Sequence, residues 1–181
     1  VLERHQQVQN TVVILTSDGG AFERGGCQTE FFDSTGGLRG RRGDLTEGGV
    51  RVPLLVRWPG TVKGRTTNDL LCSLMDLMPT TIDIAKGKQP EPLNGISLLP
   101  TLLGWKQTNR HEVLVWNQTN RFAVRKGHWK AIQETNSTWQ LFNLKADRGE
   151  VTNVVDQAPQ ILKSITNDLN KWIREKPDTG L

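Results

Sequence analysis

Two stretches of the sequence combine residue types that can bind a charged ligand. The first is "TVVILTSDGG" at 11–20, an apolar, β-branched run that ends on Asp18 and two glycines. A carboxylate at the carboxyl end of a buried strand lies where open α/β sheets bind their ligands, and Ca²⁺ and Mg²⁺ prefer oxygen donors. Asp18 is therefore a candidate metal ligand. The alternative is a turn in which its carboxylate accepts hydrogen bonds from neighbouring amides.

The second stretch is "GLRGRRGDLTEGGVRVP" at 37–53, which places arginines among closely spaced glycines. Glycines allow the backbone to approach a ligand, and guanidinium groups donate forked hydrogen bonds that suit a tetrahedral oxyanion. A sulfate or phosphate group is the ligand that this chemistry predicts. The alternative is a twisted surface loop in which Glu47 and Arg51 pair with each other or with backbone groups. The arginines are Arg39, Arg41 and Arg42.

The remaining chemistry-bearing residues are isolated. His5, His111 and His128 show no metal-binding spacing, so we interpret them as structural or surface residues. Cys27 and Cys72 have no CxxC spacing and can form one disulfide or stay as two thiols.

Composition and motifs exclude several classes of protein. The 23 Lys and Arg against 19 Asp and Glu give a net charge of +4, and these basic residues are not interleaved with stacking aromatics as a surface for single-stranded nucleic acid requires. No run is apolar enough for a membrane span, and no GxSxG, Walker or Rossmann motif is present. The opening "VLERHQQVQN" is typical of a helix end and its loop, so we expect a piece of a longer protein.

The first half has the pattern of an α/β layer. Continuous apolar runs at 11–17 and 51–60 predict strands buried on both faces in a parallel or mixed sheet. Helical spacing at 68–87 predicts two sheet-packing helices, with Pro79 in the first turn of the second helix and Gly87 as its cap. The glycine-rich stretch between the two strands predicts a long ordered loop.

The second half changes to short strands. "EVLVW", "RFAVRKGHWKAIQ" with Lys126-Gly127 as its turn, and "STWQLFNL" predict an antiparallel sheet. One apolar helical face in "APQILKSITNDLNKWI" predicts a helix that packs on this sheet.

Taken in order, these segments resemble the C-terminal portion of formylglycine-dependent sulfatases of the alkaline phosphatase superfamily. "TVVILTSDGG" is similar to the strand that ends in Asp-Asn-Gly, and "GLRGRRGDLTEGGVRVPLLVRWPG" to the Leu-Arg-Gly-x-Lys-Gly-x-x-x-Glu-Gly-Gly-x-Arg-x-Pro block. The other matching segments are "DLMPTTIDIAKG", "LNGISLLPTLLG", "AVRKGHWKAI" and "LFNLKADRGEVTNV", the last similar to Leu-Tyr-Asp-Leu-x-x-Asp-Pro-x-Glu-x-x-Asn-Leu.

The resemblance implies roles for the two candidate sites. Asp18 takes the place of an aspartate that coordinates a divalent cation, usually Ca²⁺, and Gly19 that of an asparagine that also ligates the metal, so one side-chain oxygen is missing here. Arg42 takes the place of a lysine that contacts the substrate sulfate, and Arg39, in the same block, is a second candidate for binding the substrate. We interpret Arg42 as a catalytic-site residue that binds the sulfate, because an arginine side chain stays protonated and transfers no proton. Glu47 and Arg51 are expected to shape the loop.

The same resemblance implies parts that these residues do not contain. The Cys/Ser-x-Pro-x-Arg motif that becomes the formylglycine nucleophile lies upstream in the family, and neither Cys27 nor Cys72 has the required Pro and Arg. We therefore expect a sulfatase fragment that supplies a metal aspartate and a sulfate-binding loop, with no activity alone. The alternatives are a non-catalytic, sulfatase-like anion-binding module and, less well matched, a phosphodiesterase or phosphonate hydrolase of the same superfamily.

The implied fold is an incomplete alkaline-phosphatase-like mixed sheet flanked by helices, followed by a small four-stranded antiparallel sheet with one helix. We assign residues 1–108 to the α/β core and 109–181 to the C-terminal α+β subdomain. The expected partners are a sulfated small molecule or glycan and the N-terminal part of the same enzyme, without which the chain is expected to be poorly soluble. The expected location is extracytoplasmic, with which the sequons at Asn117 and Asn136 are compatible.

Overall fold

The computed structural model describes residues 1–23, 25 and 28–175, which form two compact units. The first unit contains residues 1–18 and 53–111, and the second contains residues 19–52 and those from 112 onward. The sequence boundary at 108/109 lies close to the break at 111/112, but the glycine-rich segment packs with the second unit. The division into α/β core and C-terminal subdomain stays a prediction.

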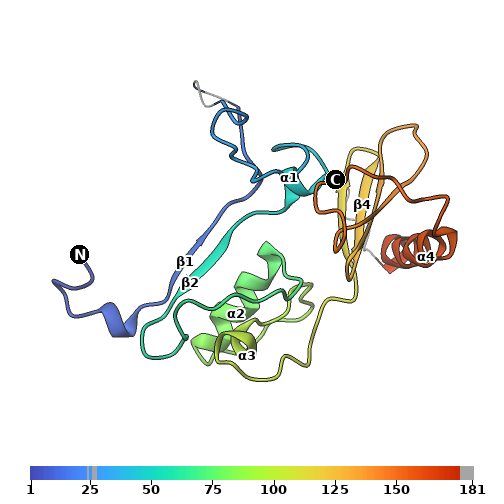
Figure 1. Ribbon diagram of the computed structural model, residues 1–181. Helices are drawn as coiled ribbons and strands as arrows, with labels where there is room; N and C mark the ends of the chain where they lie inside the picture. The colour runs from blue at the N-terminus through green and yellow to red at the C-terminus, as the bar shows by residue number, and fades with distance from the viewer. Residues whose placement is uncertain (24, 26–27, 176–181) are drawn as a thin grey trace. The chain divides into compact units, whose positions relative to one another are not determined.

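The first unit contains an antiparallel strand pair, β1 (Val13–Thr16) and β2 (Leu54–Arg57), drawn in Figure 1. Both strands fall within the predicted segments. Burial on both faces is wrong for this chain, because Leu15 is 62% exposed and its register partner Leu55 is 57% exposed. Alternate residues are half-buried, so the described part of the chain covers only one face of the pair.

The predicted helix pair begins later than expected. The helical elements of the first unit are η1 (Val8–Asn10), η2 (Leu74–Asp76), α2 (Leu77–Ile84) and α3 (Leu99–Leu102). The chain before η2 is extended because Ser73 and Asp76 form a capping box, which fixes the helix start there. Pro79 lies in the first turn of α2 as predicted, but Lys86, with φ 54°, takes the left-handed position after the helix in place of Gly87.

Asp76 connects the loops around α2. Its carboxylate is fully buried and accepts hydrogen bonds from the backbone N–H groups of Ser73 at 2.7 Å and Ile96 at 2.8 Å. The Nε2 atom of His111 lies 2.8 Å from the same carboxylate. His111 is therefore a structural residue, in agreement with the sequence interpretation.

The second unit contains the predicted four-stranded antiparallel sheet and its helix. The sheet has the order β3-β4-β5-β6, and α4 (Pro159–Glu175) packs against β4 and β5. The hairpin turn between β4 and β5 is Gly127-His128, one residue later than predicted, because β4 continues through Lys126. The strands are β3 (Leu114–Gln118), β4 (Arg121–Lys126), β5 (Trp129–Gln133) and β6 (Gln140–Asn143).

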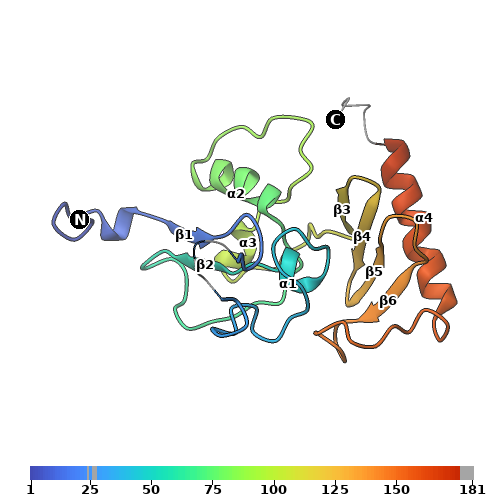
Figure 2. The same ribbon diagram turned by 90° about the horizontal axis from the view of Figure 1, so that it is seen from above.

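The two faces of this sheet bury different clusters, and Figure 2 shows α4 on one face and α1 (Glu47–Val50) on the other. Because side chains alternate along each strand, neighbouring residues of one strand belong to different clusters. The α4 face buries Val124, Ala131 and Leu141 with Ile165 and Leu169 of the helix. The opposite face buries Ala123, Ile132 and Phe142 with Leu45 of the glycine-rich segment.

No helix among the described residues is both long enough and apolar enough to span a membrane.

The packing of α4 on the sheet predicts how much stability the unit loses when a buried side chain of this helix is shortened. Ile165 is fully buried against the sheet, so I165A should lower the free energy of unfolding of this unit by about 2–5 kcal/mol through lost burial and a residual cavity. The matched control is I173A on the same helix, whose side chain is 46% exposed and whose loss should cost less than about 1 kcal/mol. Urea titration of both variants checks this; equal losses would contradict the packing of α4.

Candidate anion-binding site

Two loop segments of the second unit lie directly against each other. The N–H of Gly20 donates to the carbonyl of Gly49 at 2.9 Å, and the N–H of Arg42 donates to the carbonyl of Ala21 at 2.9 Å. These bonds join the segment that follows Asp18 in the chain to the glycine-rich block. The Arg42 backbone is therefore held by Ala21, the residue that directly follows the other candidate stretch.

The glycines of this region make room for backbone. A Cβ on Gly20 would lie 1.8 Å from the carbonyl oxygen of Gly48, and a Cβ on Gly48 would lie 2.2 Å from that of Gly40. A Cβ on Gly49 would lie 2.1 Å from the carbonyl oxygen of Asp44. Real Cβ atoms do not approach so closely, so a larger residue at any of these positions would push the loops apart. The sequence predicted glycines that admit a ligand; at these positions they admit neighbouring backbone instead.

The three arginines have different neighbours. The guanidinium carbon of Arg39 lies 4.8 Å from the ring centroid of buried Phe142, a cation–π contact with the sheet. Arg41 forms an ion pair with Glu23 and is 57% exposed. Arg39 and Arg41 therefore each have a structural partner.

Arg42 lies beside Gly19 and Phe22. Its guanidinium carbon is 5.6 Å from the Phe22 ring centroid, and a Cβ on Gly19 would lie 3.3 Å from its Cγ. The structure thus brings together two residues that the sequence had assigned to different roles. A side chain at Gly19 would require the stem of Arg42 to shift by a few tenths of an ångström. The roles of both residues in binding stay predictions.

Asp18 is exposed and comes two residues after the end of β1. It belongs to the first unit, whereas Gly19 begins the second. Asp18 offers one carboxylate, which suits a hard cation, and Gly19 offers only its backbone oxygen. Over the described ranges, no three or more His, Cys, Asp and Glu side chains are grouped closely enough to hold a metal ion. The metal roles of Asp18 and Gly19 stay predictions.

A cavity of about 580 Å³ opens beside Arg41 within the same unit. Four carboxylates line it, and their charge would repel a sulfate group. This cavity is therefore poorly suited to a sulfate group. The acidic residues of the lining are Glu23, Glu30, Asp33 and Asp44.

Glu47, at the start of α1, is the charged centre beneath the loop. Its side chain is 1% exposed and lies 3.0 Å from Lys130 Nζ and 3.3 Å from one guanidinium nitrogen each of Arg51 and Arg125. Burial alone would raise the pKa of Glu47, but Lys130, Arg125 and Arg51 outweigh it, so the pKa lies below its ordinary value. Pairing of Glu47 with Arg51 is confirmed as one contact of a larger group.

Lys130 and Glu150 are the structural residues that our sequence interpretation missed. Both are fully buried, and neither was singled out as a candidate. A signal was present for each. Glu150 occupies the glutamate of the matched C-terminal pattern, and Lys130 interrupts the apolar alternation of its strand. Both signals become informative only once the fold brings the two charges next to Glu47.

The comparisons with known proteins agree along most of the chain. The family model described as N-sulphoglucosamine sulphohydrolase, C-terminal, matches residues 44–178. An N-acetylgalactosamine-6-O-sulfatase of Bacteroides thetaiotaomicron is 31% identical over 188 residues, covering 91% of this chain and 37% of the relative. Human arylsulfatase A is 37% identical over 134 residues, covering 68% of this chain and 25% of that protein.

Solved structures show the same relationship. A structure described under the metabolism of multiple glycosaminoglycans by Bacteroides thetaiotaomicron superposes with a TM-score of 0.80 at 30% identity, covering 94% of this chain and 40% of the other. Another, of a protein in complex with k-i-k-neocarrahexaose, gives 0.79 at 26% identity, with 94% and 38% covered.

Fold and sequence thus place the chain in the sulfatase family, in the region that its family model describes as C-terminal. The chain belongs to the N-sulphoglucosamine sulphohydrolase C-terminal family, which confirms the resemblance to sulfatases and the predicted fold class. It spans well under half of the length of these relatives.

The backbone packing of the loops predicts the effect of a single methyl group. G20A should break the Gly20–Gly49 hydrogen bond and speed amide hydrogen exchange at Arg42 and Gly48, because its Cβ has no space. The control is G64A, where a Cβ meets nothing within 4 Å. Unchanged exchange in G20A would show that the two loop segments are not held together in this way.

The lowered pKa of Glu47 predicts a pH dependence. A carboxyl whose pKa is depressed by folding stabilises the protein fully above its ordinary pKa, here 4.5, and loses this contribution as pH falls through the folded-state pKa. Between about pH 5 and pH 3, the free energy of unfolding should therefore fall less in E47Q than in the unaltered protein. Urea titrations at several pH values measure this, and an unchanged pH slope in E47Q would contradict it.

Proposed function

We propose that this chain is the sulfate-binding C-terminal part of an enzyme that hydrolyses sulfate esters. The observation that carries the proposal is the family match over residues 44–178. Arg42 lies two residues before this range, in the close-packed glycine block that continues into it. A guanidinium group on a close-packed loop suits sulfate, since it can donate two parallel hydrogen bonds to two oxygens of the anion.

Arg42 is the proposed sulfate-binding residue. It stays protonated at all working pH values and therefore binds and orients the sulfate group without transferring a proton. Arg39 has the secondary role, because its contact with Phe142 ties its guanidinium to the sheet surface. Arg39 would then support the loop and contribute positive potential near the anion.

Asp18 is proposed as one ligand of a divalent cation, Ca²⁺ by the family resemblance. Such a cation, when bound, supplies positive charge that stabilises the sulfate oxygens. Gly19 contributes no side-chain oxygen, so this chain offers fewer donors than the family pattern. The formylglycine nucleophile would come from the N-terminal part of the enzyme.

A sulfated glycan is the proposed class of substrate. Two relatives support this: one is named for the 6-O-sulfate of N-acetylgalactosamine, and the other was solved in connection with glycosaminoglycan metabolism. Both cover more than nine-tenths of this chain. The proposal extends to an extracytoplasmic location, in which the exposed sequon residues Asn117 and Asn136 would be accessible to modification.

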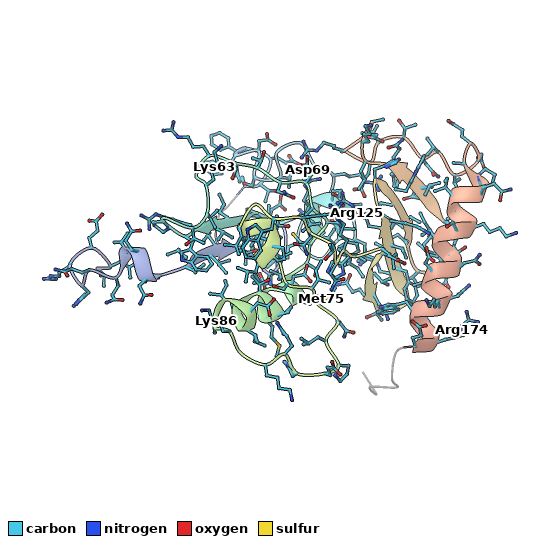
Figure 3. The ribbon with its side chains drawn as sticks, turned by 90° about the horizontal axis from the view of Figure 1, so that it is seen from below. Lys63, Asp69, Met75, Lys86, Arg125 and Arg174 are labelled. Atoms are coloured by element: carbon cyan, nitrogen blue, oxygen red, sulfur yellow. The ribbon has the colours of Figure 1, made fainter. Side chains whose placement is uncertain are left out.

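The proposed partner is the N-terminal part of the same enzyme. The exposed apolar residues Leu15 and Leu55 lie opposite each other on the β1–β2 pair, and burying them would be favourable. A further sheet layer or helix of the α/β core is the element that fits this face. Apolar side chains around α2 are exposed as well, among them Met75, which Figure 3 labels.

The second candidate is a non-catalytic anion-binding module. The observation that favours it is Gly19, which removes one oxygen donor from the proposed metal site. Such a module would bind sulfated ligands through Arg42 and would not turn them over. Turnover of a sulfate ester by the complete protein decides between the two.

Charge removal at Arg42 tests the proposal. In the complete protein, R42Q should raise the dissociation constant for inorganic sulfate by about tenfold or more, because a charge-assisted bidentate contact is lost. The control is R41Q, which removes an exposed arginine of the same loop that pairs with Glu23. Calorimetry measures both variants; equal affinity in R42Q and the unaltered protein would overturn the assignment.

A further inference from the structure

Lys130 lies at the centre of the sheet face that the glycine-rich block covers. Cross-strand pairing places it opposite Arg125 on β4 and Phe142 on β6. Its side chain is fully buried, and its ammonium group lies 5.8 Å from the ring centroid of Trp116. A fully buried lysine is rare unless a counter-charge stabilises it.

Two buried carboxylates supply that counter-charge. Lys130 Nζ lies 3.0 Å from Glu47 Oε1, with which it forms a hydrogen bond, and 3.0 Å from Glu150 Oε1, with which it forms an ion pair without hydrogen-bond alignment. Glu150 also accepts the backbone N–H of Glu47 at 2.7 Å. Lys130 thus joins β5, the turn after β6 and the start of α1 through one ammonium group.

Arg125 completes the anchor from the neighbouring strand. Its guanidinium lies 3.3 Å from Glu47 Oε2, and Figure 3 labels it on the side of the sheet away from α4. Leu45, 4% exposed, packs on the same face two residues before Glu47. The glycine-rich block is therefore held to the sheet by one apolar contact and one buried charge group.

The anchored residues are those that hold the loop surface. Gly48, directly after Glu47, donates its N–H to the carbonyl of Arg39 at 2.8 Å, and Gly49 accepts the N–H of Gly20. Arg42 in turn donates its N–H to Ala21, next to Gly20. If Glu47 moved, Gly48 and Gly49 would move with it. Their hydrogen bonds to Arg39 and Gly20 would then be disturbed, and with them the two segments that position Arg42.

We propose that Lys130 is a positioning residue for the anion-binding loop, acting through Glu47 and Glu150 to hold Arg42 in its binding geometry. This inference rests on the proposed function of Arg42 as the sulfate-binding residue. Lys130 itself is buried beneath the loop and touches no ligand. Replacing a purely structural lysine would change only the stability of the protein. Replacing a positioning lysine would weaken binding of the anion even where the overall fold is unchanged.

The experiment uses the complete protein and two variants of the buried group. K130M leaves buried Glu150 without the ammonium group it pairs with and is expected to unfold the unit. K130M/E150Q removes one positive and one negative charge together, while Glu47 keeps Arg125 and Arg51 as partners. K126M is the control, because this lysine of the same hairpin is 43% exposed and pairs with Asp168 of α4.

Hydrogen exchange at the amides of Gly20, Arg42 and Gly48 reports the loop, and calorimetry with inorganic sulfate reports the site. We expect K130M/E150Q to retain protection at β4 and β5, to lose it at the loop amides, and to bind sulfate about tenfold to a hundredfold more weakly. K126M should change neither measurement.

Loop amides that stay protected in K130M/E150Q would overturn the inference. Loosened loop amides with unchanged sulfate affinity would overturn it too, provided that R42Q weakens binding in the same assay. If R42Q itself leaves the affinity unchanged, the proposed function fails, whereas the exchange data still report whether Lys130 anchors the loop.

Discussion

The ion pairs of Lys130 with Glu47 and Glu150 are the interaction on which the second unit depends. Removing the ammonium group alone would leave Glu150 as a buried charge without its partner and would take one of three cationic partners from Glu47. Breaking such a group typically costs about 3–5 kcal/mol, a large fraction of a domain's stability. The group joins strand, turn and glycine-rich block into one unit, although these lie far apart in sequence.

Close backbone packing adds a second constraint of a different kind. At Gly20, Gly48 and Gly49 two backbone segments approach so closely that no Cβ fits. Backbone hydrogen bonds join these segments. Such a loop has little freedom to rearrange, which suits the recognition of a small, symmetrical anion by one guanidinium group. The charged group fixes where the loop sits on the sheet, and the glycines fix the shape of its surface.

Much of the fold follows from local sequence pattern. The antiparallel sheet and α4 follow from alternation and helical periodicity, and the order of motifs identifies the sulfatase family. Local pattern fails where the answer depends on distant residues. Leu15 has the sequence of a buried strand, yet it is exposed because the described part of the chain supplies no layer for that face. The helix near Leu70 begins late because Ser73 and Asp76 form a local cap.

The candidate site shows the same limit. Arg42 and the glycine block are visible in sequence because they are contiguous. Lys130 and Glu150 are not, because they lie 83 and 103 positions from Glu47 and meet it only in the folded structure. The contact of Arg39 with Phe142 is equally long-range, and the role of Arg39 in binding stays a prediction.

The most direct test of the account is a crystal structure of the complete protein with a sulfated sugar bound. The account predicts that the sulfate oxygens lie within hydrogen-bonding distance of the Arg42 guanidinium, with the contacts of Glu47 to Lys130 and of Gly20 to Gly49 intact. A sulfate group bound elsewhere, with no contact to the loop of residues 39–49, would contradict it.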